Sequence, residues 1–188
     1  MIIHICGNFC TGKTTAAEIL RRRLGWPVVP IGRVRQALRH ELMAWAAAKR
    51  LWDAWDRPEP APGRSGIWVS TGLNWREAVA WGLRPEWPWV FRVRLTAPER
   101  VLLDRQARRA AAGFEDGGYW PYAEGTGWLL RSLAVYDRGE VPFPLPVDLT
   151  VGTEALPPEA VAEAALDAWR AWCRRRGIIV PPAGDGPV

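Results

Sequence analysis

Residues 1–14 read MIIHICGNFCTGKT, and the stretch from Gly7 to Thr14 matches the phosphate-binding pattern G-x-x-x-x-G-K-[ST] at every fixed position. Glycine at Gly7 and Gly12 lets the loop turn back so that successive backbone N–H groups point at phosphate oxygens, a concavity that a Cβ would obstruct. Lys13 adds a cation between the outer phosphates, and the Thr14 hydroxyl is placed to be a ligand of a phosphate-bound Mg²⁺. The stretch therefore predicts a nucleoside triphosphate site.

The residues on either side of this loop fit a strand, a turn and a helix. A short β-branched apolar run precedes the loop, and from Ala16 to Leu24 apolar residues recur at spacings of three and four before Gly25. Such a helix would direct the positive end of its dipole at bound phosphates. The predicted nucleotide-binding residues are those of the loop and of the first helical turn: Gly7, Asn8, Phe9, Cys10, Thr11, Gly12, Lys13, Thr14 and Thr15.

Length and composition limit the class of protein. A chain of 188 residues fits one domain, and three cysteines without metal-ligand spacing, together with two histidines, argue against a zinc site. No stretch approaches the ~20 apolar residues needed to cross a bilayer, so we expect a soluble, cytoplasmic protein. The net charge of +5 suits an anionic partner but does not choose between a nucleotide and a nucleic acid.

Two biases in composition bear on the site. Of the 25 basic residues only Lys13 and Lys49 are lysine, so this chain otherwise uses arginine. Lysine is nevertheless present at position 13, where a compact ammonium suits the phosphates. The chain also carries 13 tryptophans. Base stacking is one interpretation, and packing inside the protein is the one we favour, because Trp45, Trp52 and Trp55 have the spacing of a buried helical stripe.

The order of strand and helix patterns predicts an α/β fold with a parallel sheet covered by helices on both faces, its ligand at the carboxyl ends of the strands. We expect a single domain over residues 1–176, with an acceptor-binding segment at about 32–64, a glycine-rich lid within about 105–127 and a tail at 177–188. The expected strands are 2–6, 28–31, 67–71, 89–95 and 147–151; the expected helices are about 14–24, 32–55, 75–81, 97–112, 128–136 and 158–176.

Several segments together resemble the nucleoside and nucleotide kinases of the P-loop group, the adenylate-kinase-like small-molecule kinases, over most of residues 1–172. The resemblance implies a three-layer P-loop NTPase fold with a five-stranded parallel sheet and a small lid, and ATP and Mg²⁺ as cofactors. Residues 31–35 resemble the start of the acceptor segment, where Arg35 would bind the acceptor. Residues 71–76 resemble the end of the third strand, where Arg76 and Thr71 would face it.

The same resemblance assigns roles beyond the loop. Residues 95–109 look like the segment that leads into the lid, and Arg105 and Arg109 match its two arginines, one over the adenine ring and one at the transferring phosphoryl group. Being four apart, they share a helix face, although a solvated basic face is the alternative. Residues 151–153 resemble the loop against the donor base, with Gly152 and Thr153 in contact with it.

Two positions depart from that group. Its kinases often end the third strand with an acidic residue that holds a magnesium-bound water, whereas this chain has Ser70 and Thr71. Either Thr14, phosphates and water hold the metal, or an acid arrives from elsewhere, with Glu41 and Asp53 as the candidates. Sugar and polynucleotide kinases tend to have an aspartate near Gly32 as a base, where this chain has Arg33, which mildly favours a phosphate acceptor.

We therefore expect an ATP-dependent phosphotransferase, with Lys13, Arg105 and Arg109 catalytic, that acts on a nucleoside monophosphate or a similar small molecule. One alternative is a polynucleotide 5′-hydroxyl kinase, which keeps nucleic acid open as a partner. The other is a nucleotide-binding regulatory protein with weak ATPase activity. The sequence names neither the acceptor nor the oligomeric state, and we expect no membrane partner.

Overall fold

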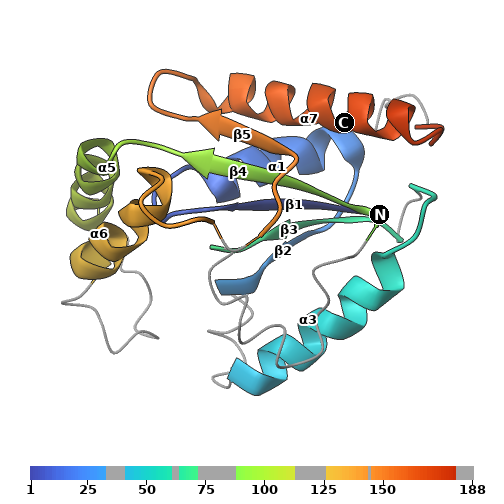
Figure 1. Cartoon of the computed structure of the whole chain (residues 1–188). Coiled ribbons are helices and arrows are strands. Elements are labelled where there is room, and N and C mark those ends of the chain that lie inside the picture. The colour runs from blue at the N-terminus through green and yellow to red at the C-terminus, as the bar shows by residue number, and fades with distance from the viewer. Residues whose placement is uncertain (33–40, 61–63, 72–87, 113–125, 144, 181–188) are drawn as a thin grey trace.

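The computed structural model describes residues 1–32, 41–60, 64–71, 88–112, 126–143 and 145–180. Strands and helices alternate along most of this chain (Figure 1). The elements are β1 (Ile2–Gly7), α1 (Lys13–Leu24), β2 (Val28–Pro30), α3 (Glu41–Trp55), β3 (Gly66–Val69), β4 (Val90–Thr96), α5 (Glu99–Ala111), α6 (Thr126–Asp137), β5 (Leu149–Gly152) and α7 (Pro158–Arg175).

The five strands form one parallel sheet, as the resemblance implied, and their order is β2-β3-β1-β4-β5. Helices α1 and α7 cover one face of the sheet, and α3 lies on the other face (Figure 1). Helices α5 and α6 stand at the end of the sheet to which β4 runs. The three-layer arrangement is therefore confirmed, and the carboxyl ends of the strands face the loop between β1 and α1.

The central strand β1 is buried along its whole length, so its side chains feed both layers of the core. Ile3 and Ile5 pack in the cluster under α1 and α7, which includes Trp169. Ile2 points to the opposite layer, where it packs with the tryptophans of α3 and β3. Burying apolar side chains on both faces is the expected pattern for a parallel strand in the middle of a sheet.

The tryptophans serve mainly as packing material. Every tryptophan whose side chain the structure describes is buried or half-buried, including Trp52 and Trp55 of the predicted stripe. The Trp55 ring fills the space beside Gly66 so closely that a Cβ there would lie 2.2 Å from it. In the described part of the chain these rings are thus not exposed stacking platforms.

Several element boundaries match the sequence expectations and several differ. Helix α1 ends at Gly25, whose φ of 66° is the left-handed conformation expected of a glycine helix end. Helix α6 begins at Thr126, two residues before the predicted start. Ile178 and Val180, which we expected in a tail, pack against the core under α7. The helix predicted at 75–81 lies outside the described residues.

Among the described residues, no helix is both long enough and apolar enough to cross a bilayer.

Candidate nucleotide-binding site

The loop that joins β1 to α1 has the backbone conformations that its glycines allow. Gly7 has a φ of 134°, and a Cβ on it would lie 2.1 Å from the carbonyl oxygen of Leu95 in β4. Gly12 has a φ of 87° and open space around it. Glycine at the first position therefore permits close packing against the neighbouring strand, and glycine at the second permits the left-handed turn into α1. We expected a Cβ at either position to obstruct the phosphate-binding concavity. In the structure, a Cβ on Gly7 would instead clash with β4, and a Cβ on Gly12 would meet no neighbouring atom.

Side-chain hydrogen bonds hold this loop in shape. The Asn8 side-chain oxygen accepts a bond from the Phe9 backbone N–H at 2.7 Å, and the Thr11 hydroxyl donates to the Asn8 carbonyl at 2.8 Å. The Lys13 ammonium donates to the same carbonyl at 2.5 Å. Cys10, with a φ of 59°, is the residue other than glycine in the left-handed region of the described backbone. The loop is thus preformed around the Asn8 carbonyl.

The first turn of α1 is free to receive an anion. Its N-cap is Gly12, no side chain caps the helix, and no acidic residue occupies the first turn. Thr14 and Thr15 are exposed at this end of the helix. Because the first N–H groups of a helix have no partner inside the helix and carry the positive end of its dipole, this terminus suits a phosphate group.

The surroundings of Lys13 make the charged form of its ammonium less stable than it is in water. Burial lowers the pKa of its ammonium to about 8, and the nearby Arg109 lowers it further, whereas Cys6, Cys10 and Asp137 act in the opposite direction. A phosphate group delivered to the loop would supply the negative charge that the ammonium lacks.

The two predicted lid arginines of α5 both reach the loop. Arg105 donates to the Cys10 carbonyl at 3.2 Å and to the Thr153 hydroxyl at 3.0 Å, and also bonds the Thr153 carbonyl. Arg109 approaches the Cys10 thiol, with 3.9 Å between Nη1 and Sγ. Both arginines therefore lie on the face of α5 that is directed at this loop, and their roles at the adenine ring and at the transferring phosphoryl group stay a prediction.

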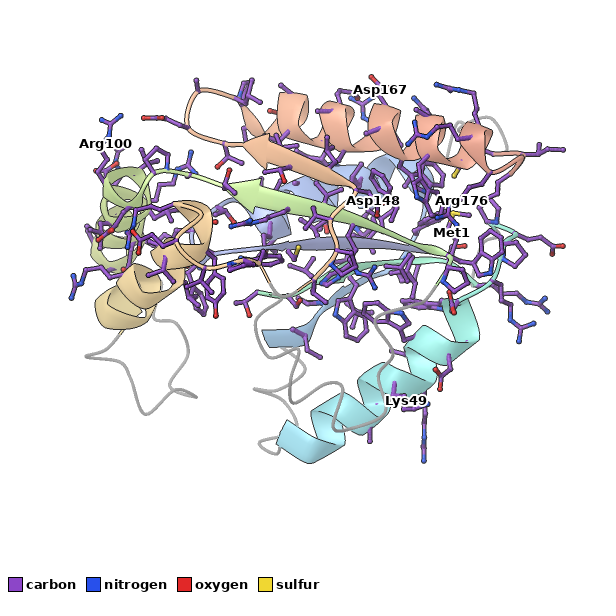
Figure 2. All side chains as sticks on the ribbon, in the orientation of Figure 1. Met1, Lys49, Arg100, Asp148, Asp167 and Arg176 are labelled. Carbon is purple, nitrogen blue, oxygen red and sulfur yellow. The ribbon has the colours of Figure 1, made fainter. Side chains whose placement is uncertain are left out.

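The other arginines of α5 face outward and pair with acids there. Arg100, at the outer side of the molecule in Figure 2, forms an ion pair of 2.5 Å with Glu154. Arg108 pairs with Asp104 at 2.8 Å while its side chain is 78% exposed. Helix α5 thus has a solvated basic face with Arg100 and Arg108 and a second face, directed at the loop, with Arg105 and Arg109.

The loop after β5 is tied to β4. The Thr153 N–H donates to the Thr96 carbonyl at 2.8 Å, and the Thr153 hydroxyl donates to the same oxygen at 3.2 Å. Gly152 ends β5 and is exposed, with open space where a Cβ would stand. Through Arg105, this loop is joined to the phosphate loop.

The end of β3 supplies hydroxyls and a carbonyl instead of an acid. The Thr71 carbonyl accepts a bond from the Gly7 N–H at 3.3 Å, so this residue supports the loop through its backbone. The Ser70 hydroxyl lies 2.8 Å from His4 Nε2. Burial, with a smaller effect of Arg92, lowers the pKa of His4 to about 3, so the ring is neutral at physiological pH.

Of the two acids that the sequence offered in place of the missing carboxylate, Asp53 can be placed, and it lies away from the loop. Asp53 forms an ion pair with Lys49 on α3 and lies close enough to Asp56 to raise its pKa. Asp56 in turn accepts a bond from the Trp89 N–H, next to the start of β4. Asp53 therefore lies at the edge of the sheet where the strands begin, whereas Thr14 lies at the edge where they end. The prediction that Asp53 replaces the missing carboxylate is wrong. The side chain of Glu41 and all of Arg35, Arg76 and Arg33 lie outside the described residues.

A buried acid that we did not predict stands beside the loop instead. Asp137, the last residue of α6, forms an ion pair with Arg94 of β4 at 3.0 Å, and burial raises the pKa of its carboxyl group. Arg94, the Asn8 side chain and Lys13 oppose that rise. An arginine within the apolar strand sequence VFRVRLT was the one signal that the sequence offered.

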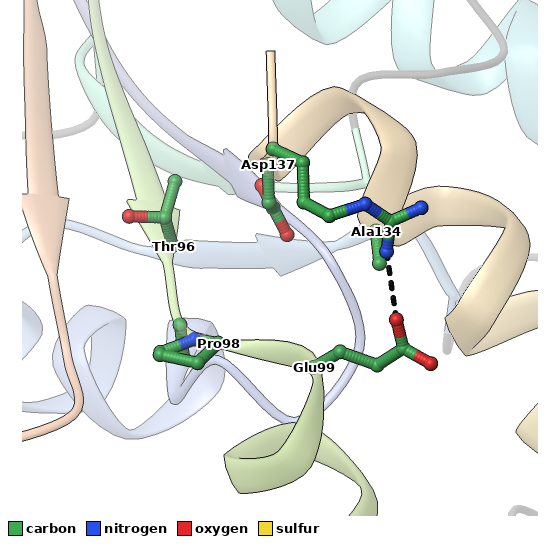
Figure 3. A pocket seen from close by; sticks show the side chains of 7 residues that line it. Thr96, Pro98, Glu99, Ala134 and Asp137 are labelled. Atoms are coloured by element: carbon green, nitrogen blue, oxygen red, sulfur yellow. Dashed lines mark hydrogen bonds and ion pairs between the residues drawn. The ribbon is translucent and has the colours of Figure 1, made fainter. Parts of the chain in front are cut away.

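A hollow of about 220 Å³ adjoins this acid, between β4, α5 and α6. Figure 3 shows Thr96 and Pro98 on one side and Asp137 and Ala134 on the other. The ion pair between Arg138 and Glu99, at 2.7 Å, closes one end. The carboxyl end of β4 is thus lined by the acid and by the first turn of α5.

The described residues contain no group of three or more His, Cys, Asp or Glu side chains that could hold a metal ion. The Thr14 hydroxyl, which we predicted as a ligand of a phosphate-bound Mg²⁺, is exposed at the loop. This fits the ion's habit of keeping several waters and taking the rest of its ligands from substrate phosphates.

No protein-family model matches the chain, and no curated protein matches its sequence. Solved structures match its fold. A gluconokinase from Sinorhizobium meliloti has a TM-score of 0.59 at 19% identity, covering 93% of this chain and 94% of its own. A shikimate kinase from Acinetobacter baumannii, solved with shikimate, has a TM-score of 0.59 at 16% identity, with coverages of 90% and 93%.

An APS kinase from Mycobacterium tuberculosis, solved with AMPPNP and APS, matches with a TM-score of 0.52 at 16% identity, covering 90% of this chain and 96% of its own. The chain therefore has the fold of P-loop small-molecule kinases over about nine-tenths of its length. At these identities the likeness extends to the fold and to no particular substrate.

Proposed function

We propose that this protein is an ATP-dependent phosphotransferase that transfers the γ-phosphoryl group to a small molecule. The observation that carries the proposal is the convergence of Lys13, Arg105 and Arg109 on one preformed loop beside an uncapped helix N-terminus. Three cations and a set of unpartnered N–H groups at one place suit a polyphosphate chain and the charge that its transfer spreads over oxygens.

Each of these residues has a separate task in the proposed reaction. The loop N–H groups and Lys13 bind and orient the outer phosphates, so Lys13 exchanges the Asn8 carbonyl for phosphate oxygens. Arg105 holds the base-binding loop to the phosphate loop and covers the base. Arg109, exposed at the next turn of α5, neutralises charge on the group in transfer.

Mg²⁺ fits the Thr14 hydroxyl and would supply charge neutralisation at the β- and γ-phosphates. The Ser70 hydroxyl, oriented by His4, lies at the end of β3, where it can accept a hydrogen bond from a water of the metal. No carboxylate is then needed at that strand end. This arrangement is the first of the two that the sequence left open.

We further propose a nucleoside monophosphate or a similar small molecule as the acceptor, from the resemblance of the segments that carry Arg35 and Arg76. Phosphorylation of a polynucleotide drew part of its support from the tryptophans. The tryptophans whose side chains the structure describes are buried or half-buried, so these rings give it no support. A purely regulatory protein has no need of Arg109 at the loop, so transfer remains the better interpretation.

The test is a screen for acceptor-dependent ADP release with Mg·ATP. Nucleosides, nucleoside monophosphates, sugars and oligonucleotides are tried with the wild-type protein and with Lys13→Ala. We expect ADP release that depends on a monophosphate or related small molecule and that falls by orders of magnitude in Lys13→Ala. Acceptor-independent hydrolysis alone would support the regulatory alternative, and full turnover by Lys13→Ala would contradict the assignment of the loop.

A further inference from the structure

The amino edge of the sheet, where the strands begin, carries arginines that the proposed function does not use. Figure 1 shows that α3 and α7 both end near the start of β1. Three segments bring the arginines there: the residues after α3, the residues before β3 and the end of α7. The side chains are exposed, and we call them the amino-edge arginines: Arg57, Arg64, Arg174, Arg175 and Arg176.

The contacts of Met1 show that these three segments meet at one place. The Met1 nitrogen donates to the carbonyl of Trp55, the last residue of α3, and to the carbonyl of Arg64 at 3.2 Å. The Met1 sulfur lies 3.8 Å from the Cys173 thiol of α7 and accepts a bond from the Trp169 indole at 3.3 Å. The amino-edge arginines therefore surround the start of β1 and form one surface.

The charge of this surface is not balanced by acids. None of the amino-edge arginines forms an ion pair with a described residue. The acids of the same three segments, within the described residues, are Asp56 and Glu59. Asp56 is half-buried and accepts a bond from the Trp89 N–H at 3.2 Å. The surface is therefore a patch of one sign.

One of these arginines is held in place by the protein itself. Arg176 donates to the Pro88 carbonyl at 2.9 Å, and its guanidinium lies 4.3 Å from the centre of the Trp172 ring. Such contacts fix the direction of a guanidinium without neutralising its charge. Arg176 therefore remains available to an anion from outside.

The helix dipole explains only part of this patch. Arg174 and Arg175 stand in the last turn of α7, where cations complement the negative end of the dipole. Arg57 and Arg64 belong to the connection between α3 and β3 and lie outside both elements. Stabilisation of α7 therefore does not account for the patch as a whole.

The patch is remote from the phosphate loop. Strand β1 has 6 residues, so its two ends are separated by roughly 20 Å. In Figure 2, Met1 and Arg176 lie at one end of the molecule and Arg100 of α5 lies at the other. A phosphate chain bound at Lys13 would not reach the amino-edge arginines. The patch therefore suits a second anion, which binds independently of the nucleotide.

We propose that the amino-edge arginines bind the phosphodiester backbone of a nucleic acid without regard to its sequence. Several exposed guanidinium groups on one edge suit a ligand that presents many phosphates in a row. Each planar guanidinium matches a phosphate with two parallel hydrogen bonds. The inference goes beyond the proposed function and does not depend on it, because the nucleic acid is a partner here and not the phosphate acceptor.

The side chains around the patch favour this partner over a lipid surface. Binding in a membrane interface takes a broad apolar face beside the cations. The described residues that follow α7 expose one large apolar side chain, Ile179, which is 88% exposed. Trp55 and Trp172 are buried, so they offer no exposed ring on which a base could stack. Contacts to the backbone alone carry no sequence information.

Fluorescence anisotropy with labelled oligonucleotides tests the proposal on the whole chain. The probes are a short single-stranded RNA and a short duplex DNA, each of mixed sequence, titrated between about 50 and 200 mM salt with and without saturating Mg·ATP. The variant is the double substitution Arg174→Ala with Arg175→Ala. Its matched control is Arg100→Ala with Arg108→Ala, which removes the same charge from arginines of α5 that are 79% and 78% exposed.

We expect the wild type to bind both probes with an affinity that falls as salt rises. For RNA the slope of log affinity against log salt is about 0.7 per neutralised phosphate, so about 3.5 if every amino-edge arginine takes part. The double variant should lower this slope by about 1.4 and should weaken binding at least about tenfold at about 100 mM salt. The control should stay within about twofold of the wild type, and Mg·ATP should displace neither probe.

A second variant, Arg57→Ala with Arg64→Ala, covers the case in which the first one frays the end of α7, and it should show the same loss. Equal losses in the control and in both amino-edge variants would reduce the effect to net charge and overturn the proposal. Displacement by Mg·ATP would place the nucleic acid at the phosphate loop and would also overturn it. So would failure to bind either probe at about 50 mM salt. In that case, binding to vesicles of phosphatidylcholine with phosphatidylserine would assign the patch to a lipid surface instead.

Discussion

The two arginines of α5 that reach the phosphate loop should have separable effects when each is replaced by alanine. Arg109 lies with its guanidinium 3.9 Å from the Cys10 thiol. Arg105 is fixed by bonds to the Cys10 carbonyl and to Thr153. Arg109→Ala should therefore impair the chemical step, and Arg105→Ala should impair nucleotide binding.

The magnitude follows from charge and distance. Two unit charges about 4 Å apart attract by about 4 kcal/mol at an effective dielectric constant of 20, which sets an upper limit for Arg109 on a phosphoryl group in the loop. If about two-thirds of this appears only as charge develops in transfer, Arg109→Ala lowers kcat by about 10²-fold, or about 2.7 kcal/mol. Arg105→Ala loses a charged hydrogen-bond set and should weaken ATP binding about tenfold, with kcat nearly unchanged.

The assay is steady-state transfer with the acceptor from the screen, combined with calorimetric titration of Mg·ATP. Arg108→Ala is the matched control, because this arginine belongs to the same helix but is 78% exposed and paired with Asp104. It should change neither kcat nor affinity by more than twofold. Equal behaviour of all three variants would mean that the whole face is solvated, and the separate roles would have to be abandoned.

Four further outcomes are expected. Saturating Mg·ATP should protect Cys10 from alkylation while the two buried cysteines stay unreactive in both states; equal rates with and without nucleotide would count against closure of the loop around phosphate. The pKa of His4 falls from 6.5 to about 3 on folding, so on acidification the unfolded state binds the proton first. The unfolding free energy should therefore drop by about 1.6 kcal/mol between pH 6.5 and 5 in urea titrations, and His4→Gln should flatten that slope. Gly7→Ala should cost at least about 3 kcal/mol, since its Cβ meets Leu95 at 2.1 Å, against about 1–2 kcal/mol for Gly12→Ala; similar costs would refute the packing argument. Thr14→Ala should raise the Mg²⁺ concentration needed for half-maximal activity, and an unchanged titration would place the metal elsewhere.

The sequence was sufficient where the signal is local. The loop, the strand before it and the helix end at Gly25 each follow from patterns within about a dozen residues, and the structure confirms them. The convergence of Arg105 and Arg109 also followed from their spacing, because residues four apart share a helix face. Their roles at the nucleotide came from the resemblance and stay a prediction, while the structure shows that both reach Cys10 of the loop.

The sequence was insufficient where a contact joins distant segments. Asp137 lies 43 residues after Arg94, and nothing in either neighbourhood names the other. The choice of Asp53 failed for a related reason. Helix α3 has 15 residues and so spans about 22 Å, which means that an acid near its end belongs to a different edge of the sheet from one at its start. Helical periodicity gives the face of such a residue but not the edge.

The central claim, transfer from a nucleoside triphosphate to a small molecule, is tested most directly by following the γ-phosphoryl group itself. The protein is incubated with Mg²⁺ and γ-labelled ATP in the presence of pooled acceptors, and the products are separated and counted. The account predicts that the label moves onto a small-molecule acceptor with the wild type and stays on ATP with Lys13→Ala. Label found only as inorganic phosphate with every pool, or transfer that survives in Lys13→Ala, would contradict it.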